Sequence, residues 1–378
     1  MANPIGYSKE KAKNVLDNYD IDLLIASTPV NVFYTTGLPV THVAPNPILY
    51  VLSNQYPNLS MISRSGDLSA IVWSLYDSVE EFSWVPPNEV YRIGSLNAAV
   101  NILLKKVGEM NLEHNKTIGL ESYMPRYQSE ALQKEFPNIQ FITADKAFLD
   151  MRLIKTEEEI RRIRKSTEVA EKAIKACIEA AELNMKDTEL LQLARKTIVN
   201  EGAWGWDHLT MNIGPSDPEA PGLGIPVTPN DIIRFDFGAV WEGYISDVSR
   251  GVVIGEIPLK AKEAMDYMIQ VQEYCAENIK PGVYANKFRE EAQSYLKSLT
   301  KRGFYLITAH SIGLECEETH LFGPTGAMEI PFEENMVLDL EVWLNVRGQG
   351  LVGVEDCYRV SSSGCERLSQ LDKEIVIK

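Results

Sequence analysis

A stretch that alternates apolar and polar residues constrains the fold of this chain most strongly. It runs over residues 231–255, DIIRFDFGAVWEGYISDVSRGVVIG, with the turn signal WEG at 241–243. Alternation on both sides of a turn predicts a β-hairpin. A turn centred between Trp241 and Glu242 would place Asp236 opposite Asp247. A bulge at Gly243 would shift this pairing slightly.

A second stretch, residues 335–361, repeats the pattern with Glu341 and Glu355 on either side of an RGQG turn, and His310 lies between the two hairpins. Carboxylates facing each other in apolar strands repel, and burial raises the cost of each charge unless a cation lies between them. The pattern therefore predicts a metal site on strands. The alternative is a pair of exposed hairpins with solvated carboxylates.

The order of these residues resembles a known family. The contexts DFG, SDVSR, AHSIGLE, DLE and GVED are similar to those of the pita-bread metallopeptidases, namely prolidase, aminopeptidase P and their relative creatinase. The resemblance covers nearly the whole chain, because IDLLIASTPVNVFYTTGL at 21–38 resembles the opening of this branch. The stretch MRLIKTEEEIRRIRKSTEVAEKAI at 151–174 resembles its interdomain entry helix.

The resemblance implies a dinuclear-metal-dependent hydrolase that uses a metal-bridging hydroxide, most simply an Xaa-Pro dipeptidase or aminopeptidase. In the family, the residue matching Asp236 binds one ion, those matching Asp247 and Glu355 bridge both ions, and those matching His310 and Glu341 complete the ligand set of the other ion. Glu341 is the candidate proton shuttle. Oxygen-rich ligands with one imidazole favour two divalent ions of manganese or cobalt, with zinc and iron as alternatives.

The length of 378 residues favours two domains. We expect an α/β creatinase/prolidase-like domain at 1–150 and an α+β pita-bread catalytic domain at 151–378. In the first domain, helices are predicted at 8–18, 98–110 and 126–136, and strands at 22–27, 48–53, 59–63, 68–73 and 117–121. In the second, helices are predicted from Glu157, from Asp187 to a stop at Gly202, and at 260–279 and 286–300, which suggests an internal duplication.

The chain departs from the family around the expected metal site. The loop SDPEAPGLGIPVTPN contains no histidine, where family peptidases carry one. Glu317 stands in place of a second family histidine, Gly353 in place of an arginine, and Val342 in place of a proline. Glu317 could bind a cationic group or act as a general acid or base; its rival interpretation is a surface glutamate.

Two histidines remain near the catalytic part. His208 lies in GAWGWDHLTMNIG, whose Trp204 and Trp206 could line an apolar wall of the pocket, and His320 lies shortly after Glu317. Both are candidate catalytic residues, and both could equally be solvated loop residues. The isolated His42 and His114 are expected to be packing residues.

Three functions are consistent with these residues. The first is a metallopeptidase acting on short peptides. The second is an amide or ring-opening hydrolase, or a metal-assisted lyase, acting on a small non-peptide substrate, which the replaced histidines and arginine favour. The third is a non-catalytic binding protein, against which the complete ligand set argues.

Composition narrows the partners and the compartment. A net charge of -16 argues against nonspecific nucleic-acid binding, which needs a basic surface. The odd number of cysteines, 5, without a CxxC pair is typical of reduced thiols. Without a signal peptide or an apolar run of membrane length, we expect a cytoplasmic protein that does not bind membranes. The family resemblance implies a homodimer.

Overall fold

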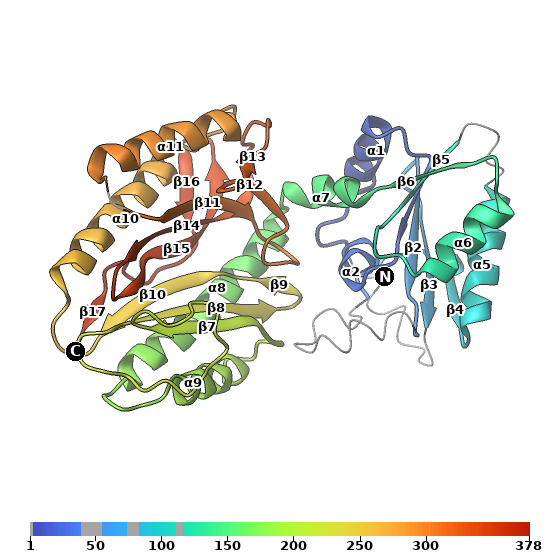
Figure 1. The fold of residues 1–378 in the computed structure, drawn as a ribbon. Coiled ribbons are helices and arrows are strands. Elements are labelled where there is room, and N and C mark those ends of the chain that lie inside the picture. The colour runs from blue at the N-terminus through green and yellow to red at the C-terminus, as the bar shows by residue number, and fades with distance from the viewer. Residues whose placement is uncertain (1–2, 39–54, 74–82, 111–115, 302) are drawn as a thin grey trace. The chain divides into compact units, whose positions relative to one another are not determined.

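The computed structural model describes residues 3–38, 55–73, 83–110, 116–301 and 303–378. The chain divides into two compact units, Met1–Arg152 and Leu153–Lys378 (Figure 1). The strand expected at 48–53, together with His42 and His114, lies outside the described residues.

The first unit is an α/β domain built on one mixed sheet with the strand order β4-β3-β2-β1-β5-β6. Strand β1 runs parallel to β5 and antiparallel to β2. The short elements α2, β4, β6 and α7 were not expected from the sequence. The strands are β1 (Leu23–Ala26), β2 (Leu59–Ser63), β3 (Leu68–Trp73), β4 (Val90–Ile93), β5 (Thr117–Leu120) and β6 (Gln140–Thr143); the helices are α1 (Lys9–Asn18), α2 (Pro29–Thr36), α5 (Leu96–Glu109), α6 (Arg126–Glu135) and α7 (Asp145–Leu153).

Helices cover both faces of this sheet. Leu103 of α5 and Leu132 of α6 belong to the core that includes Leu59 and Met61 of β2. The alternate residue of β2, Ser60, points to the other face, where its hydroxyl lies 2.6 Å from that of Thr35 in α2. Because successive residues of a strand face opposite sides, the two helix layers are separated by the sheet.

The second unit is organised around one large sheet with the strand order β13-β12-β11-β14-β15-β10-β8-β7. Its strands are β7 (Gly205–Ile213), β8 (Ile232–Trp241), β9 (Tyr244–Ile245), β10 (Val248–Val253), β11 (Tyr305–Ser311), β12 (Thr319–Gly323), β13 (Gly326–Ala327), β14 (Val337–Val346), β15 (Gly350–Ser361), β16 (Gly364–Arg367) and β17 (Val376–Ile377). Its helices are α8 (Glu157–Ala180), α9 (Asp187–Asn200), α10 (Leu259–Asn278) and α11 (Ala285–Leu299).

Two helix pairs cover the two halves of the sheet. Residues of α8 and α9 form one core with β7, β8 and β10, and residues of α10 and α11 form another with β11, β12, β14 and β15 (Figure 1). A capping box starts α8, because the Thr156 hydroxyl accepts from the Glu159 backbone while the Glu159 carboxylate accepts from the Thr156 backbone. Each helix end that was predicted for this unit lies within one or two residues of the end in the structure.

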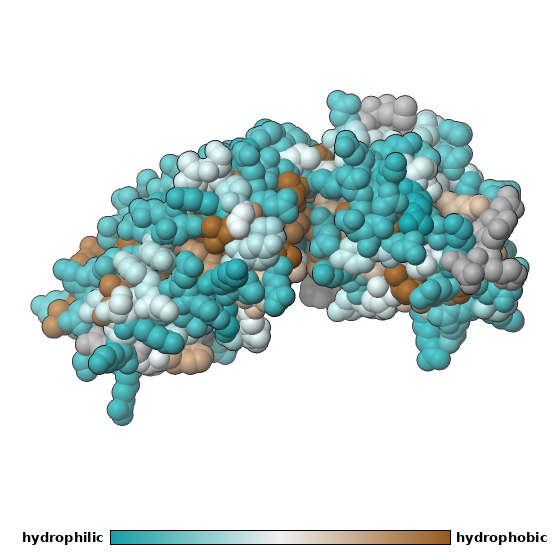
Figure 2. Space-filling model, turned by 90° about the horizontal axis from the view of Figure 1, so that it is seen from above, coloured by the Kyte–Doolittle hydropathy of each residue, from teal (hydrophilic) through white to brown (hydrophobic). Residues whose placement is uncertain are grey.

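The surface visible in Figure 2 is mainly hydrophilic, in keeping with a chain in which 24% of residues are charged. Among the described residues, none of the helices combines the length and the apolar character that crossing a bilayer requires.

Candidate metal centre

Strict alternation in the central strands places apolar side chains on the helix side of the sheet and polar ones on the other. In β8, Phe235 and Phe237 belong to the core beneath α8 and α9, so Asp236 between them points away from it. In β14, Leu340 and Val342 pack toward α10 and α11, which turns Glu341 away in the same manner. The same rule orients His310 of β11 and Glu355 of β15.

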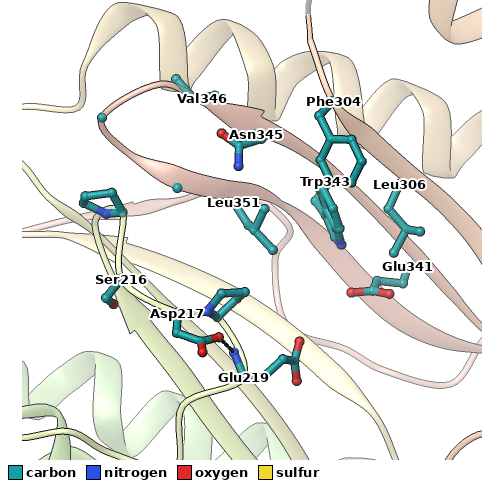
Figure 3. A pocket seen from close by; sticks show the side chains of 14 residues that line it. Ser216, Asp217, Glu219, Phe304, Leu306, Glu341, Trp343, Asn345, Val346 and Leu351 are labelled. Carbon is teal, nitrogen blue, oxygen red and sulfur yellow. Dashed lines mark hydrogen bonds between the residues drawn. The ribbon is translucent and has the colours of Figure 1, made fainter.

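These polar side chains line a small cavity, and Glu341 also borders a larger cavity next to it. The larger one, of about 470 Å³, is bordered by Phe304, Leu306, Trp343 and Leu351, with Glu219 and Glu341 at one end (Figure 3). The smaller one, of about 120 Å³, is lined by His208, Glu219, Asp236, Asp247, His310, Cys316, Glu317, Glu341 and Glu355. Because Glu219 and Glu341 border both, a molecule in the larger cavity would reach the smaller one past these two carboxylates.

The first hairpin has a register different from the expected one. Asp236 pairs with Ser249, not with Asp247. The reason is the turn, whose central residues are Glu242 and Gly243, both with positive φ (48° and 90°), as in a type I′ turn. The centre therefore lies one residue later than predicted, which moves the pairing by two residues and leaves both aspartates on one face of the sheet.

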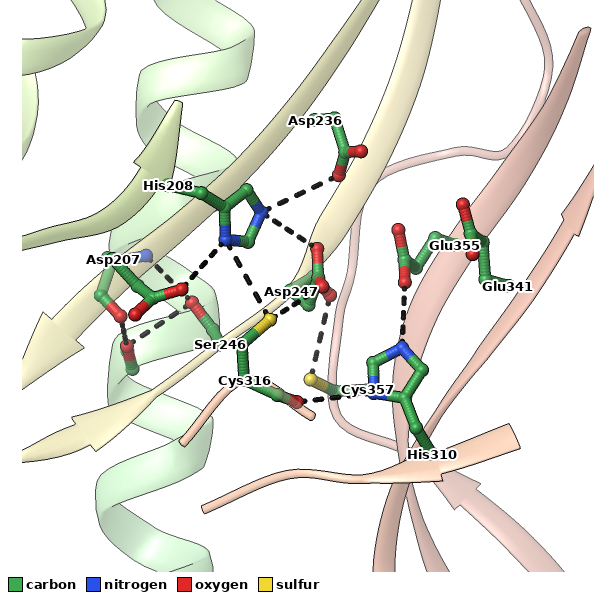
Figure 4. A network of polar contacts seen from close by, with 12 residues as sticks. Asp207, His208, Asp236, Ser246, Asp247, His310, Cys316, Glu341, Glu355 and Cys357 are labelled. Carbon is green, nitrogen blue, oxygen red and sulfur yellow. Dashed lines mark hydrogen bonds and ion pairs between the residues drawn. The ribbon is translucent and has the colours of Figure 1, made fainter. Parts of the chain in front are cut away.

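The second hairpin has the expected register. Glu341 of β14 pairs directly with Glu355 of β15, and His310 of β11 pairs with Asp339 of β14. His310 Nε2 lies 3.4 Å from Glu355 Oε1, and both side chains are 2% exposed. The structure thus brings the two hairpins and His310 to one place (Figure 4).

Candidate ligand atoms converge in overlapping groups whose members lie within 4.8 Å of one another. One group is Asp236, Glu341 and Glu355, and another is Asp247, His310 and Asp339. All five predicted metal ligands fall in these two groups. The arrangement can hold cations at adjacent positions, since a third group, His208, Asp236 and Asp247, shares one aspartate with each of the other two.

Burial and mutual repulsion oppose the negative charges of this cluster. Burial, partly offset by Arg234, raises the pKa of Glu341 to about 8. Burial, together with Asp247 and Glu341, also raises the pKa of Glu355 well above its usual range. Burial lowers the pKa of His310, which favours the neutral imidazole that binds metals.

Arg234 supplies an internal positive charge. Its guanidinium lies 3.0 Å from Asp236 Oδ2 and 3.2 Å from Glu341 Oε1, with the arginine side chain 4% exposed. Although burial opposes ionisation of Asp236, Arg234 holds the pKa of this carboxyl below its usual range. The positive charge of Arg234 therefore stabilises only the part of the cluster that contains Asp236 and Glu341.

The donor set fits divalent cations. The buried Oδ1 atom of Asp236 has no hydrogen-bond partner among the described residues, and His208 Nε2 lies 3.7 Å from it. Carboxylate oxygens with one neutral imidazole are ligands for hard or borderline divalent ions. Bound cations would add positive charge beside Glu355 and Asp247, whereas Arg234 pairs with Asp236 and Glu341.

The other predicted catalytic residues lie at different distances from this centre. His208 is brought into it, with Nε2 3.1 Å from Asp247 Oδ1. Glu317 lines the smaller cavity, yet its side chain is 58% exposed and lies 3.5 Å from His320 Nε2. His320 is 48% exposed and lines neither cavity.

The tryptophans before His208 do not form the expected pocket wall. Trp206 packs against the core of α8 and α9 with Arg195 over its ring, and Trp204 is largely exposed. Neither tryptophan lines either of the two cavities.

Sequence reasoning missed four residues of the site. Arg234 and Asp339 are charged residues inside otherwise apolar strands, and this signal could have identified them. Glu219 lies in the loop that lacks the expected histidine, and Cys316 directly precedes Glu317. Glu219 and Cys316 line the smaller cavity. Arg234 pairs with Asp236 and Glu341, and Asp339 lies next to His310 in the sheet.

Comparison with known proteins identifies relatives of both units. The sequence model of metallopeptidase family M24 matches residues 161–362, and that of the creatinase/prolidase N-terminal domain matches residues 9–154. An Xaa-Pro dipeptidase of Pyrococcus horikoshii is 27% identical over 340 residues, which cover 88% of this chain and 95% of that protein.

Solved structures share the fold. The prolidase from Pyrococcus horikoshii superposes with a TM-score of 0.78 at 24% identity, covering 97% of this chain and 99% of that one. An Xaa-Pro dipeptidase from Bacillus anthracis gives a TM-score of 0.81 at 19% identity, covering 98% and 99%. The expected combination of an N-terminal α/β domain and a pita-bread domain is confirmed.

Proposed function

Since this chain belongs to metallopeptidase family M24, we propose that it hydrolyses the peptide bond before proline in short peptides, as an Xaa-Pro dipeptidase or aminopeptidase. The observation that carries the proposal is the convergence of the predicted ligands beside a larger, partly apolar cavity. The names of the relatives support the specificity for proline. They do not favour the alternative of a small non-peptide substrate.

We propose that Asp236, Asp247, His310, Glu341 and Glu355 hold two divalent cations, with manganese or cobalt the best match to the oxygen-rich donor set. When bound, such ions supply Lewis-acid polarisation of the scissile carbonyl and activation of water. The protein supplies the positions. Four of the five side chains project from β8, β15, β14 and β11 of one sheet. The fifth, Asp247, lies directly before β10, which pairs between β15 and β8.

Glu341 is proposed to transfer the proton. Its carboxylate borders both cavities, so it can accept a proton on the metal side and deliver it to the leaving amine on the substrate side. Arg234 Nη2, 3.2 Å from Glu341 Oε1, fixes the orientation of the carboxylate. Arg234 is a positioning residue in this proposal.

The larger cavity is proposed to receive the apolar part of the peptide. Phe304 and Trp343 pack with ring centroids 5.5 Å apart, and with Leu351 they offer an apolar surface suited to a pyrrolidine ring or an aliphatic side chain. Burial of such a group would exclude water from the neighbouring carboxylates.

Charge around the cavities favours substrates without a nearby carboxylate. Among the described residues that line them, there is no lysine or arginine, whereas Asp217, Glu219 and Glu317 add negative charge. A free amino terminus would be attracted to this region, and a free carboxylate close to Glu219 would be repelled. We therefore propose that peptides whose carboxylate lies away from the site are preferred.

The protein is further proposed to act as a homodimer in the cytoplasm. The absence of disulfides among its five cysteines is in keeping with a reducing compartment. Size-exclusion chromatography with light scattering tests the dimer directly.

The proposed activity is tested by reconstituting the full-length protein with Mn²⁺ or Co²⁺ and measuring hydrolysis of Xaa-Pro dipeptides, Xaa-Pro-Yaa tripeptides and matched Xaa-Ala peptides. The proposal predicts cleavage of the prolyl peptides above the alanyl ones. Equal rates on both sets would contradict the specificity for proline, and no hydrolysis of either would contradict peptidase activity.

A further inference from the structure

Two consecutive residues of β7, Asp207 and His208, belong to one group of candidate ligands. In a regular strand, neighbours point to opposite faces. Here Trp206 pairs with Ala239 and Leu209 pairs with Phe237, so β7 contains one more residue than β8 across this interval. This β-bulge redirects the two side chains, as bulges near active sites commonly do.

A glycine leaves the space that the His208 ring occupies. A Cβ atom at position 238 would lie 2.6 Å from His208 Cε1 and 2.7 Å from Nδ1, closer than real contacts allow. Gly238 follows Asp236 in β8, so the strand that carries a proposed metal ligand also provides the recess for this imidazole.

Cys316 reaches the same place from a different segment. Its Sγ lies 3.8 Å from His208 Nδ1 and 3.0 Å from Asp247 Oδ2 (Figure 4). The loop that carries Cys316 is anchored two residues later, where the buried Glu318 carboxylate accepts from Lys155 Nζ at 2.8 Å and from the Leu314 backbone at 3.0 Å. The thiol is therefore held in position.

We propose that Asp207, His208 and Cys316 form an additional cation site beside the acidic centre. Their ligand atoms all lie within 4.8 Å of one another, and His208 Nδ1 is 3.1 Å from Asp207 Oδ2. One oxygen, one nitrogen and one sulfur ligand with a remaining open position suit zinc or another borderline divalent ion. The neighbouring centre differs, because its ligands are carboxylates and one imidazole without sulfur.

His208 would connect this site to the acidic centre. With Nδ1 on the additional cation, the Nε2–H group donates to Asp247 Oδ1 at 3.1 Å and faces Asp236 Oδ1 at 3.7 Å. A metal-bound histidine commonly donates its other N–H to a carboxylate, which fixes the ring and orients the carboxylate. In this arrangement His208 is also a positioning residue for two ligands of the proposed peptidase centre.

The test uses Co²⁺ as an optical probe in the full-length protein, because thiolate ligation gives a near-ultraviolet charge-transfer band that oxygen and nitrogen ligands do not. The wild type and the matched control Cys365→Ser should show the band. Cys316→Ser should lose it and bind one Co²⁺ fewer per chain. Absence of the band at saturating Co²⁺, or its survival in Cys316→Ser, would overturn the proposal.

Further variants separate this site from the peptidase centre. Gly238→Ala and His208→Gln should lower the affinity for the Co²⁺ that gives the band. The loss should exceed the roughly 10- to 100-fold cost of losing an outer-shell partner. Glu355→Gln should abolish peptidase activity yet retain the band, so a failure of the proposed peptidase function would leave this result readable. An unchanged Co²⁺ affinity in His208→Gln would contradict the assignment of His208 as a ligand.

A second readout does not depend on cobalt. Zn²⁺ should slow alkylation of Cys316, located by peptide mass mapping, without slowing that of the half-buried Cys365. Equal protection of both thiols, or of neither, would contradict zinc binding at Cys316.

Discussion

Glu341 lies directly opposite Glu355 in the pairing of β14 with β15. Two carboxylates in this register repel unless a cation lies between them. Asp236 joins them within 4.8 Å, and Arg234 is the cation that the chain itself provides to Asp236 and Glu341. The proposed metal centre follows from this excess of buried acid over buried base.

Removal of the proton-transfer group should suppress hydrolysis without unfolding the protein. Glu341→Gln is expected to lower kcat by about 100-fold to 10,000-fold, the usual contribution of general acid–base catalysis. Steady-state kinetics on an Xaa-Pro substrate measure this effect. The matched control is Glu329→Gln on the exposed surface, and a comparable loss in the control would count against a specific role of Glu341.

Metal-free protein should lose stability as the pH rises. Burial raises the pKa of Glu341 to about 8 in the folded state, above its ordinary value in the unfolded chain. The folded state then binds more protons between these two values, so the free energy of unfolding falls as pH increases through this window. Chelated protein should show this slope in urea denaturation, and saturating Mn²⁺ should abolish or reverse it. A stability that rises with pH in chelated protein would be inconsistent with the raised pKa.

Replacement of the buried arginine should make stability depend more strongly on metal. Arg234→Met leaves Asp236 and Glu341 without their positive partner, and removing one member of a buried ion pair typically costs about 3–5 kcal/mol. Metal-free Arg234→Met should melt at a lower temperature and gain more from Mn²⁺ than the wild type does. Arg234→Lys, which retains the charge, should lie between them in differential scanning calorimetry. Equal metal-induced shifts in all three proteins would contradict a shared electrostatic role.

Much of this arrangement could be predicted from alternation alone. Asp236 and Glu341 each stand between two apolar neighbours, and this pattern places them on one face whatever the exact register. The register of the first hairpin was wrong because Glu242, which is not glycine, adopts positive φ in the turn. The sequence contains no pattern that predicts positive φ at Glu242, so the predicted turn centre lies one residue too early.

The position of His208 could not be predicted, because it depends on a bulge. Strand β7 was not recognised from GAWGWDHLTMNIG, whose alternation is broken between Trp206 and Leu209. Arg234 could have been identified, since a basic residue within the apolar run DIIRFDFG requires an acidic partner when buried. Its partners, Asp236 and Glu341, are only evident once β8 and β14 lie in one sheet.

The negative charge of Glu219, which borders both cavities, should control substrate choice. Xaa-Pro amides and tripeptides are expected to have higher kcat/KM than the corresponding free Xaa-Pro acids. Glu219→Gln should narrow this difference by roughly two- to five-fold, the effect of about 0.5–1 kcal/mol for a partly exposed charge. Its isosteric side chain controls for size. An unchanged ratio would show that Glu219 does not sense the substrate carboxylate.

The most direct test is a crystal structure of the protein soaked with Mn²⁺, with anomalous difference maps recorded for that metal. We expect two anomalous peaks among Asp236, Asp247, His310, Glu341 and Glu355. A map with no peak among these five side chains, while Mn²⁺ is bound elsewhere or not at all, would contradict the proposed metal centre.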